Sequence, residues 1–159
     1  MAKGHCIDED KELEETPVTL LDANVLLYNH NEDSAQHQAV AAWLGEQRRT
    51  GETIGLSWIT LWAFLRISTN PKLWPTAKSV DGAWRIVQEW LRHPAVVMVE
   101  PGSRHAEILE SLMREERVTG PKVTDAALAA LAIEYGAVLA SSDRDFRRFP
   151  SLKWVNPAA

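Results

Sequence analysis

The chain has 159 residues, of which 45% are hydrophobic and 25% charged, values typical of one globular domain. Its formal net charge of −5 argues against a protein that coats nucleic-acid phosphates non-specifically. No apolar run approaches the roughly 20 residues that cross a bilayer, and the N-terminus lacks the apolar core of a signal peptide. Cys6 is the single cysteine, which excludes an internal disulfide. We therefore expect no membrane association and a reducing, cytoplasmic location.

The N-terminal segment differs in composition from the rest. Residues 1–15 hold six acidic residues and two lysines, a net charge of −4, which leaves −1 for the remainder. Residues 1–16 have no hydrophobic period, and such a composition is typical of disorder. We expect residues 1–16 to be a disordered acidic tail or an extension, and residues 17–159 to form a single domain.

The first structured stretch is predicted to be a buried strand that ends on a carboxylate. Val18, Leu20 and Leu21 form a short apolar run of the kind found in parallel sheets that are covered on both faces. Asp22 follows where the run should continue, and a buried carboxylate is costly unless it is paired or binds a metal. Asp22 is therefore either the cap of the next helix or the first residue of a functional site.

Helices and strands alternate along the remaining chain. Two of the helices have distinctive faces: residues 57–68 are apolar almost all round, which predicts a buried helix, and residues 80–92 place Val80, Trp84, Val87 and Leu91 on one face. The alternation of helices and strands predicts an α/β fold with a central parallel sheet of about five strands and helices on both faces. The expected helices are 35–49 (N-cap Ser34), 57–68, 80–92 (N-cap Ser79), 103–116 and 125–135 (with Gly136 just past its end), and the further strands are 54–56, 95–99, 137–140 and 153–155.

Acidic residues recur where these strands end. Asp143 lies just past the strand at 137–140, Asp145 follows it, and Asp125 begins the helix that leads into that strand. If this strand neighbours the first, Asp22 and Asp143 meet at the same edge of the sheet, and Asp125 points into the same cleft. Clustered carboxylates repel one another and need a cation, and oxygen ligands suit Mg²⁺ or Mn²⁺. Each acid also has a structural interpretation, since Asp125 can cap a helix and Asp143 and Asp145 can belong to a solvated turn.

A resemblance to a known family rests on these same residues. Leu21-Asp-Ala-Asn-Val-Leu-Leu27, Val123-Thr-Asp-Ala-Ala-Leu-Ala-Ala-Leu-Ala132 and Ser142-Asp-Arg-Asp-Phe146 are similar to the motif series of PIN-domain ribonucleases. Within that family, Ser57-Trp58, Phe64-Leu-Arg66, Thr69-Asn-Pro71 and Phe149-Pro-Ser-Leu-Lys-Trp154 resemble the VapC toxins of bacterial toxin–antitoxin pairs. The similarity runs from about residue 18 to residue 157.

The resemblance implies a PIN-like fold and Mg²⁺- or Mn²⁺-dependent hydrolysis of RNA, with tRNA or rRNA as the expected substrate. It also implies a cognate VapB-like antitoxin and a possible homodimer. Asp22, Asp125 and Asp143 match the metal-binding catalytic residues, with Asp145 as a supporting catalytic candidate. Asn24 and Arg144 are the candidates for substrate binding.

One position departs from the family pattern. Many PIN enzymes have a glutamate where this chain has Ala63, and no acidic residue occurs between Glu52 and Asp81. We therefore expect one well-formed metal site, and we keep a catalytically weakened PIN module that binds RNA or a protein partner as the alternative. Most tryptophans are expected in the core or at protein interfaces, with Trp74 as the most exposed.

Overall fold

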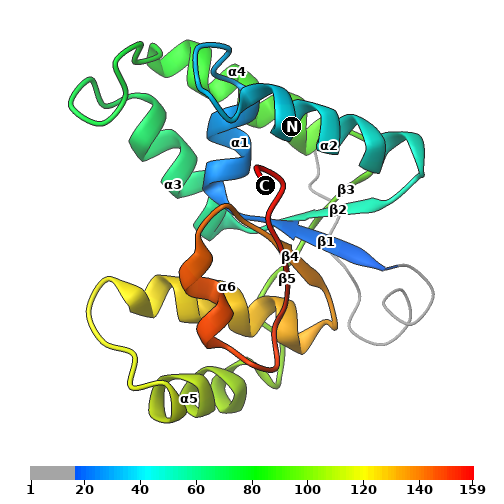
Figure 1. Cartoon of the computed structure of the whole chain (residues 1–159), viewed down its shortest axis with the longest axis vertical. Helices are drawn as coiled ribbons and strands as arrows, with labels where there is room; N and C mark the ends of the chain where they lie inside the picture. Colours follow the sequence, from blue (N-terminus) through cyan, green and yellow to red (C-terminus); the bar gives the residue numbers. More distant parts are fainter. Residues whose placement is uncertain (1–16) are drawn as a thin grey trace.

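A computed structural model describes residues 17–159, so the acidic tail expected at residues 1–16 lies outside the described residues. The described chain forms a five-stranded parallel sheet between two layers of helices (Figure 1), as the sequence predicts. The strand order is β3-β2-β1-β4-β5, which places the first strand at the centre. The strands are β1 (Val18–Leu21), β2 (Thr53–Leu56), β3 (Val96–Met98), β4 (Val138–Ala140) and β5 (Lys153–Val155).

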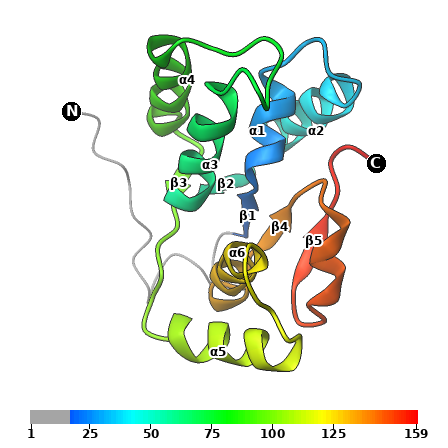
Figure 2. The same ribbon diagram turned by 90° about the vertical axis from the view of Figure 1, so that its left-hand side faces the viewer.

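The helices divide between the two faces of the sheet. One layer holds α1 (Ala23–Asn29), α2 (His37–Arg49), α3 (Trp58–Ser68) and α4 (Val80–Arg92), and the other holds α5 (His105–Glu115) and α6 (Lys122–Glu134), as Figures 1 and 2 show. A short 3₁₀ helix, η1 (Arg144–Arg148), follows β4. No helix among residues 17–159 is long and apolar enough to cross a membrane.

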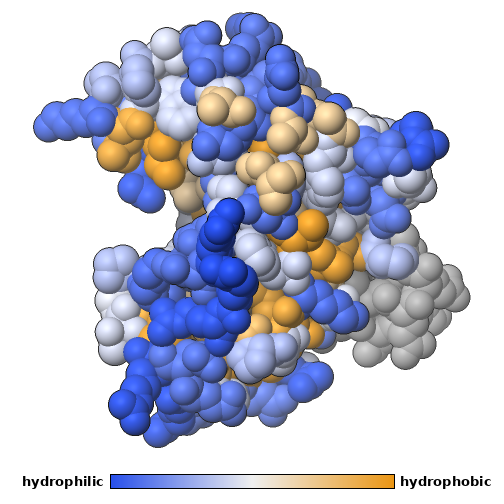
Figure 3. All heavy atoms as spheres, in the orientation of Figure 1, coloured by the Kyte–Doolittle hydropathy of each residue, from blue (hydrophilic) through white to orange (hydrophobic). Residues whose placement is uncertain are grey.

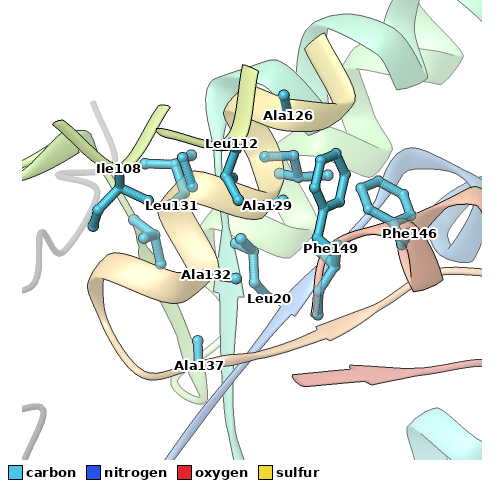
Figure 4. Packing of buried hydrophobic residues seen from close by; sticks show 14 of the residues in the cluster. Leu20, Ile108, Leu112, Ala126, Ala129, Leu131, Ala132, Ala137, Phe146 and Phe149 are labelled. Atoms are coloured by element: carbon cyan, nitrogen blue, oxygen red, sulfur yellow. The ribbon is translucent and has the colours of Figure 1, made fainter. Parts of the chain in front are cut away.

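β1 supplies the centre of both hydrophobic cores because its side chains alternate between the faces. Val18 and Leu20 pack with α5, α6 and η1, whereas Leu21 packs with the helices of the other layer. Figure 4 shows the first of these cores, in which Leu20 lies beneath the alanine-rich face of α6 and close to Phe149. The small alanine side chains of α6 let that helix lie close to the sheet.

Gly55 in β2 is a position where the sheet has no room for a side chain. Leu20 of β1 is its register partner. A Cβ atom at Gly55 would lie 2.8 Å from Cγ1 of Val18 and 2.9 Å from Cγ2 of Val99. The close approach of these two valines therefore requires glycine here.

The start of two helices differs from the prediction. α2 begins at His37, and the hydroxyl of Ser34 is buried without a hydrogen-bond partner, so Ser34 is not its N-cap. α6 begins at Lys122 rather than at Asp125, because Pro121 occupies the N-cap position and proline is compatible with a helix start. Asp125 consequently lies in the first turn of α6 and does not cap it.

The prediction that Trp74 is the most exposed tryptophan is wrong. Trp62 of α3 and Trp84 of α4 are 64% and 44% exposed, whereas Trp74 is half-buried against the core. α4 turns Ala83, Val87 and Trp90 inward and leaves Val80 in solvent, so its apolar face is rotated from the predicted one. α3 has a solvent-facing side at Trp62 because the sheet and its neighbouring helices cover only part of its surface.

Candidate active site

Asp22 stands at the junction of β1 and α1, at the edge of the sheet where the parallel strands end. Its backbone N–H donates to the carbonyl of Ala140 at 2.9 Å, so the β1–β4 ladder continues to this residue. Its Oδ1 accepts from the backbone N–H of Ala23 at 2.7 Å, which makes Asp22 the N-cap of α1. The cap interpretation of Asp22 is therefore confirmed. Its role as a site residue stays a prediction, and capping uses only one of its two carboxylate oxygens.

The second oxygen of Asp22 is held by a small polar network. Oδ2 accepts from the hydroxyl of Ser141 at 2.6 Å and from the side-chain amide of Asn24 at 3.2 Å. The Asn24 amide also donates to Ser141 Oγ at 3.0 Å, and its Oδ1 accepts from the backbone N–H of Ser142 at 3.1 Å. Ser141 is fully buried and accepts from the backbone N–H of Asp143 at 3.1 Å. These bonds fix the end of β4 against the end of β1.

Asp125 reaches the same place from the opposite layer of helices. Asp22, Asn24 and Asp125 line one cavity of about 400 Å³, whose other walls come from α1, α3 and the start of α6. α3 contributes Ile59, Ala63, Arg66 and Ile67 to the lining. Figure 2 looks at this edge of the sheet, with α1 and α3 above it and α6 below. Residues that are more than 100 positions apart in sequence therefore share one site.

Asp143 and Asp145 lie beside the cavity at the start of η1. Asp143 caps η1 by accepting from the backbone N–H of Asp145 at 2.9 Å. Asp145 is exposed and pairs with Lys122, whose Nζ lies 2.5 Å from Asp145 Oδ2 and 3.8 Å from Asp125 Oδ2. Lys122 thus stands between two of the predicted catalytic acids. Arg144 is exposed and lies outside the cavity lining.

A comparison with protein families bears on this fold. A family model described as the PIN domain matches residues 19–152. The chain belongs to the PIN-domain family.

Curated relatives narrow the placement within that family. This PIN domain is 38% identical over 140 residues to Ribonuclease VapC37 of Mycobacterium tuberculosis, an alignment that covers 88% of the chain and 97% of the relative. It is 37% identical over 136 residues to Ribonuclease VapC33 of the same species, and that alignment covers 86% of the chain and 95% of the relative. The resemblance to VapC ribonucleases inferred from the sequence motifs is therefore confirmed.

Solved structures show the same fold. The VapBC2 complex from Rickettsia felis, bound to a DNA fragment from its promoter, contains a chain that matches this PIN domain with a TM-score of 0.66. The match covers 87% of this chain and 98% of the other at 18% identity. The predicted PIN-like architecture is confirmed.

The pKa values of the two cavity aspartates of this PIN domain are both raised. Burial raises the pKa of Asp22 above its ordinary value, and the charge of Asp143 raises it further, although the hydrogen bonds from Ser141, Ala23 and Asn24 oppose the shift. Burial also raises the pKa of Asp125, with further increases from Asp22, Asp143 and Asp145 that Lys122 partly offsets. The pKa of Asp145 is lowered by its hydrogen bond to Lys122. Asp22, Asp125 and Asp143 therefore act on one another electrostatically.

The donor chemistry of the cavity fits a divalent cation. Within the described part of the chain, no three Asp, Glu, His or Cys side chains already converge on a single point that would hold a metal ion. Mg²⁺, however, is usually bound by one or two carboxylates and keeps several waters. Two partly buried carboxylates, whose pKa values are raised first by burial and then by neighbouring acids, line one cavity and meet that requirement.

Sequence reasoning missed Ser141 and underestimated Asn24. Asn24 was predicted to bind substrate, which stays a prediction, and in this structure its amide is occupied in holding Asp22, Ser141 and Ser142. Ser141 is the first polar residue after the buried strand β4, just as Asp22 is the first after β1. That parallel position is the sequence feature that could have identified it.

Proposed function

We propose that this PIN domain is the ribonuclease toxin of a toxin–antitoxin pair and hydrolyses RNA phosphodiester bonds. One observation carries the proposal: Asp22 and Asp125 approach from opposite layers of the fold, share one open cavity and repel each other electrostatically. A structural pair of acids would be expected to have a cationic partner within the cavity. Lys122 lies closer to Asp145 than to Asp125. Arg66 also lines the cavity, but among residues 17–159 no ion pair joins it to either acid.

We propose Mg²⁺ or Mn²⁺ as the cofactor, held by Asp22 and Asp125 with Asp143 at the side. Such an ion would supply the positive charge that stabilises the phosphodiester during displacement. Ser141 and Asn24 keep Oδ2 of Asp22 in place, and Lys122 orients Asp145 at the margin of the site. Asp145 is thus a supporting residue in this scheme, and Arg144, which is exposed on η1, would contact substrate phosphates farther from the cavity.

The proposed substrate is RNA, with tRNA or rRNA as the expected class, and the proposed partner is a VapB-like antitoxin. The relatives named ribonuclease and the VapBC complex of Rickettsia felis support both parts. The protein as a whole is acidic, so RNA contacts must depend on local cations near the cavity rather than on net charge.

The decisive test changes the cavity acids without changing their shape. Asp22→Asn and Asp125→Asn should each lower RNA cleavage in Mn²⁺ by more than about 100-fold, since losing even an outer-shell partner of a metal ligand costs about 10–100-fold. Both variants should also lose the rise in melting temperature that Mn²⁺ gives the wild-type protein, which EDTA should reverse. Asp33→Asn, at an exposed loop position, is the matched control. Full activity in both cavity variants would refute the site.

A second candidate function has one specific observation in its favour. Ala63 lines the cavity where many PIN enzymes carry a glutamate, so the site has one carboxylate fewer. The protein would then be a module that binds RNA or a protein partner and cleaves poorly. RNA that binds the wild-type protein but stays intact in both Mn²⁺ and EDTA would favour this function over the ribonuclease.

A further inference from the structure

A second cavity adjoins the carboxylate cavity between α3 and α6. It has a volume of about 410 Å³ and shares Ile59, Ala63, Arg66 and Thr124 with the first. Trp62, Val123 and Ala127 complete its lining. Figure 3 shows the molecule hollowed on the side where α3 and α6 face each other. The two cavities are therefore parts of one groove, and Ala63 is one of the four residues on the wall that they share.

The lining of the second cavity combines a flat aromatic ring with one cation. Trp62 is 64% exposed, and its ring lies 6.5 Å from that of Trp58 at a tilt of 35°. Arg66 follows Trp62 by one helical turn, so both side chains lie on the same face of α3. Among residues 17–159, Arg66 is one of the cations without a hydrogen bond or ion pair from its side chain, so its guanidinium is available to an anion. The remaining lining is mostly apolar.

Ala63 is a small, uncharged residue on the shared wall of this groove. An acidic side chain at this position would add negative charge to both cavities and repel a phosphate near it. Alanine instead adds no negative charge to the shared wall, whose one charged residue is Arg66. A ligand that passes along the groove would place an anionic group near Asp22 and Asp125 and an aromatic group near Trp62.

We propose that this second cavity is a subsite for an unpaired RNA base next to the scissile phosphate. The base stacks on Trp62, and Arg66 contacts a backbone phosphate between the base and the acidic pair. Aromatic side chains bind splayed-out bases of single-stranded RNA in this way, whereas a base within a duplex is already stacked. The inference rests on the proposed ribonuclease function and adds that the protein selects RNA with an unpaired nucleotide beside the cleaved bond.

The test measures RNA binding without cleavage. Fluorescence anisotropy of a labelled single-stranded hexanucleotide, in Ca²⁺ in place of Mn²⁺, should give an affinity that falls at least about fivefold in Trp62→Ala, because one base stack contributes at least that much. Trp62→Phe should recover most of the affinity, since phenylalanine keeps the stacking face. Trp84→Ala, which removes another exposed tryptophan outside both cavities, is the matched control.

A hexanucleotide with an abasic site tests the contact from the RNA side. An abasic substitution at one position should weaken binding to the wild-type protein and have no further effect in Trp62→Ala. Equal affinities for Trp62→Ala and Trp84→Ala would overturn the subsite. So would a Trp62→Ala variant that loses self-association or antitoxin binding but keeps RNA affinity, since the face would then be a protein interface.

The two proposals fail separately. The wild-type protein could fail to cleave RNA in Mn²⁺ while Trp62→Ala and the abasic site still weaken RNA binding. That result would reject the ribonuclease and keep the site that binds the base. Cleavage that proceeds with no effect of Trp62 or of the abasic position would reject the subsite and keep the ribonuclease.

Discussion

At the scale of single residues, the hydroxyl of Ser141 connects three segments that converge at the site. It donates to Asp22, which follows β1, and accepts from Asn24 of α1 and from the backbone N–H of Asp143. Its hydrogen bond favours the ionised form of Asp22 and opposes the rise in pKa that burial causes. Ser141 is thus a positioning residue that acts through the carboxylate.

Replacement of this hydroxyl should change both stability and pH dependence. Ser141→Ala removes one of the two hydrogen bonds to Oδ2 of Asp22 and leaves the backbone N–H of Asp143 without its acceptor. The free energy of unfolding should therefore fall by roughly 1–3 kcal/mol. The pKa of Asp22 should rise further, so cleavage should be lost at a higher pH as the medium is acidified. The measurements are urea denaturation and a pH–rate profile. Ser142→Ala is the control, because its recorded bond to Asn24 uses only the backbone N–H; an equal shift in both variants would contradict this role.

At the scale of elements, two serines that look alike in sequence differ in their contribution to helix starts. Ser79 has extended backbone angles, and its Oγ accepts from the backbone N–H of Gly82 at 3.0 Å at the start of α4. Ser34 precedes α2 by several residues in a turn, and its hydroxyl is buried without a partner. An N-cap residue typically has an extended backbone, which lets its side-chain oxygen accept from a backbone N–H of the first turn. The local sequence does not determine the backbone conformation at residue 34.

These two positions give a paired stability test. Ser79→Ala should lower the free energy of unfolding by about 0.5–2 kcal/mol, because the first turn of α4 loses the acceptor for Gly82. Ser34→Ala should have little effect or stabilise slightly, because it removes a buried hydroxyl that has no partner. Urea denaturation of both variants measures the difference. A larger loss in Ser34→Ala than in Ser79→Ala would contradict the assignment of the cap to Ser79 and of an unpartnered hydroxyl to Ser34.

At the scale of the whole molecule, His30 links three helices of one layer. It caps the end of α1, its ring meets those of Phe64 and Trp90 edge-on, and its Nε2 accepts from Trp90 Nε1 at 2.8 Å. That hydrogen bond requires an unprotonated Nε2. Burial, together with the charges of Lys78, Arg48 and His37, lowers the pKa of His30 to about 4.

The lowered pKa predicts a specific pH dependence of stability. In the unfolded chain His30 takes up a proton below about pH 6.5, whereas in the folded protein it does so only below about 4. The unfolded state therefore binds more protons between these values, and the free energy of unfolding should decline as pH falls from about 6.5 to about 4. Denaturation at several pH values should show this slope, reduced in His30→Gln and retained in His93→Gln. An unchanged slope in His30→Gln would contradict the prediction.

The order of elements was predictable because each pattern depends on neighbours in sequence. The buried run at Val18–Leu21, the cap at Ser79 and the glycine at 136 all appear in the structure as expected, and Gly136 has the positive φ of 60° that a helix end of this kind requires. Asp22 and Asp143 could be placed at one edge of the sheet, since parallel strands end on the same side. Their shared role in a metal site remains a prediction.

What the sequence alone determined is therefore the alternation of strands and helices and the position of acids at strand ends, because periodicity and strand direction are local properties. Only the tertiary structure decided how each helix is rotated and which polar groups meet. Trp62 and Trp84 are exposed, and Trp90 is buried, because packing against neighbouring helices selects one face of an apolar helix. The Asp22–Asn24–Ser141 network likewise exists only because β1 and β4 are adjacent, a contact between residues more than 100 positions apart.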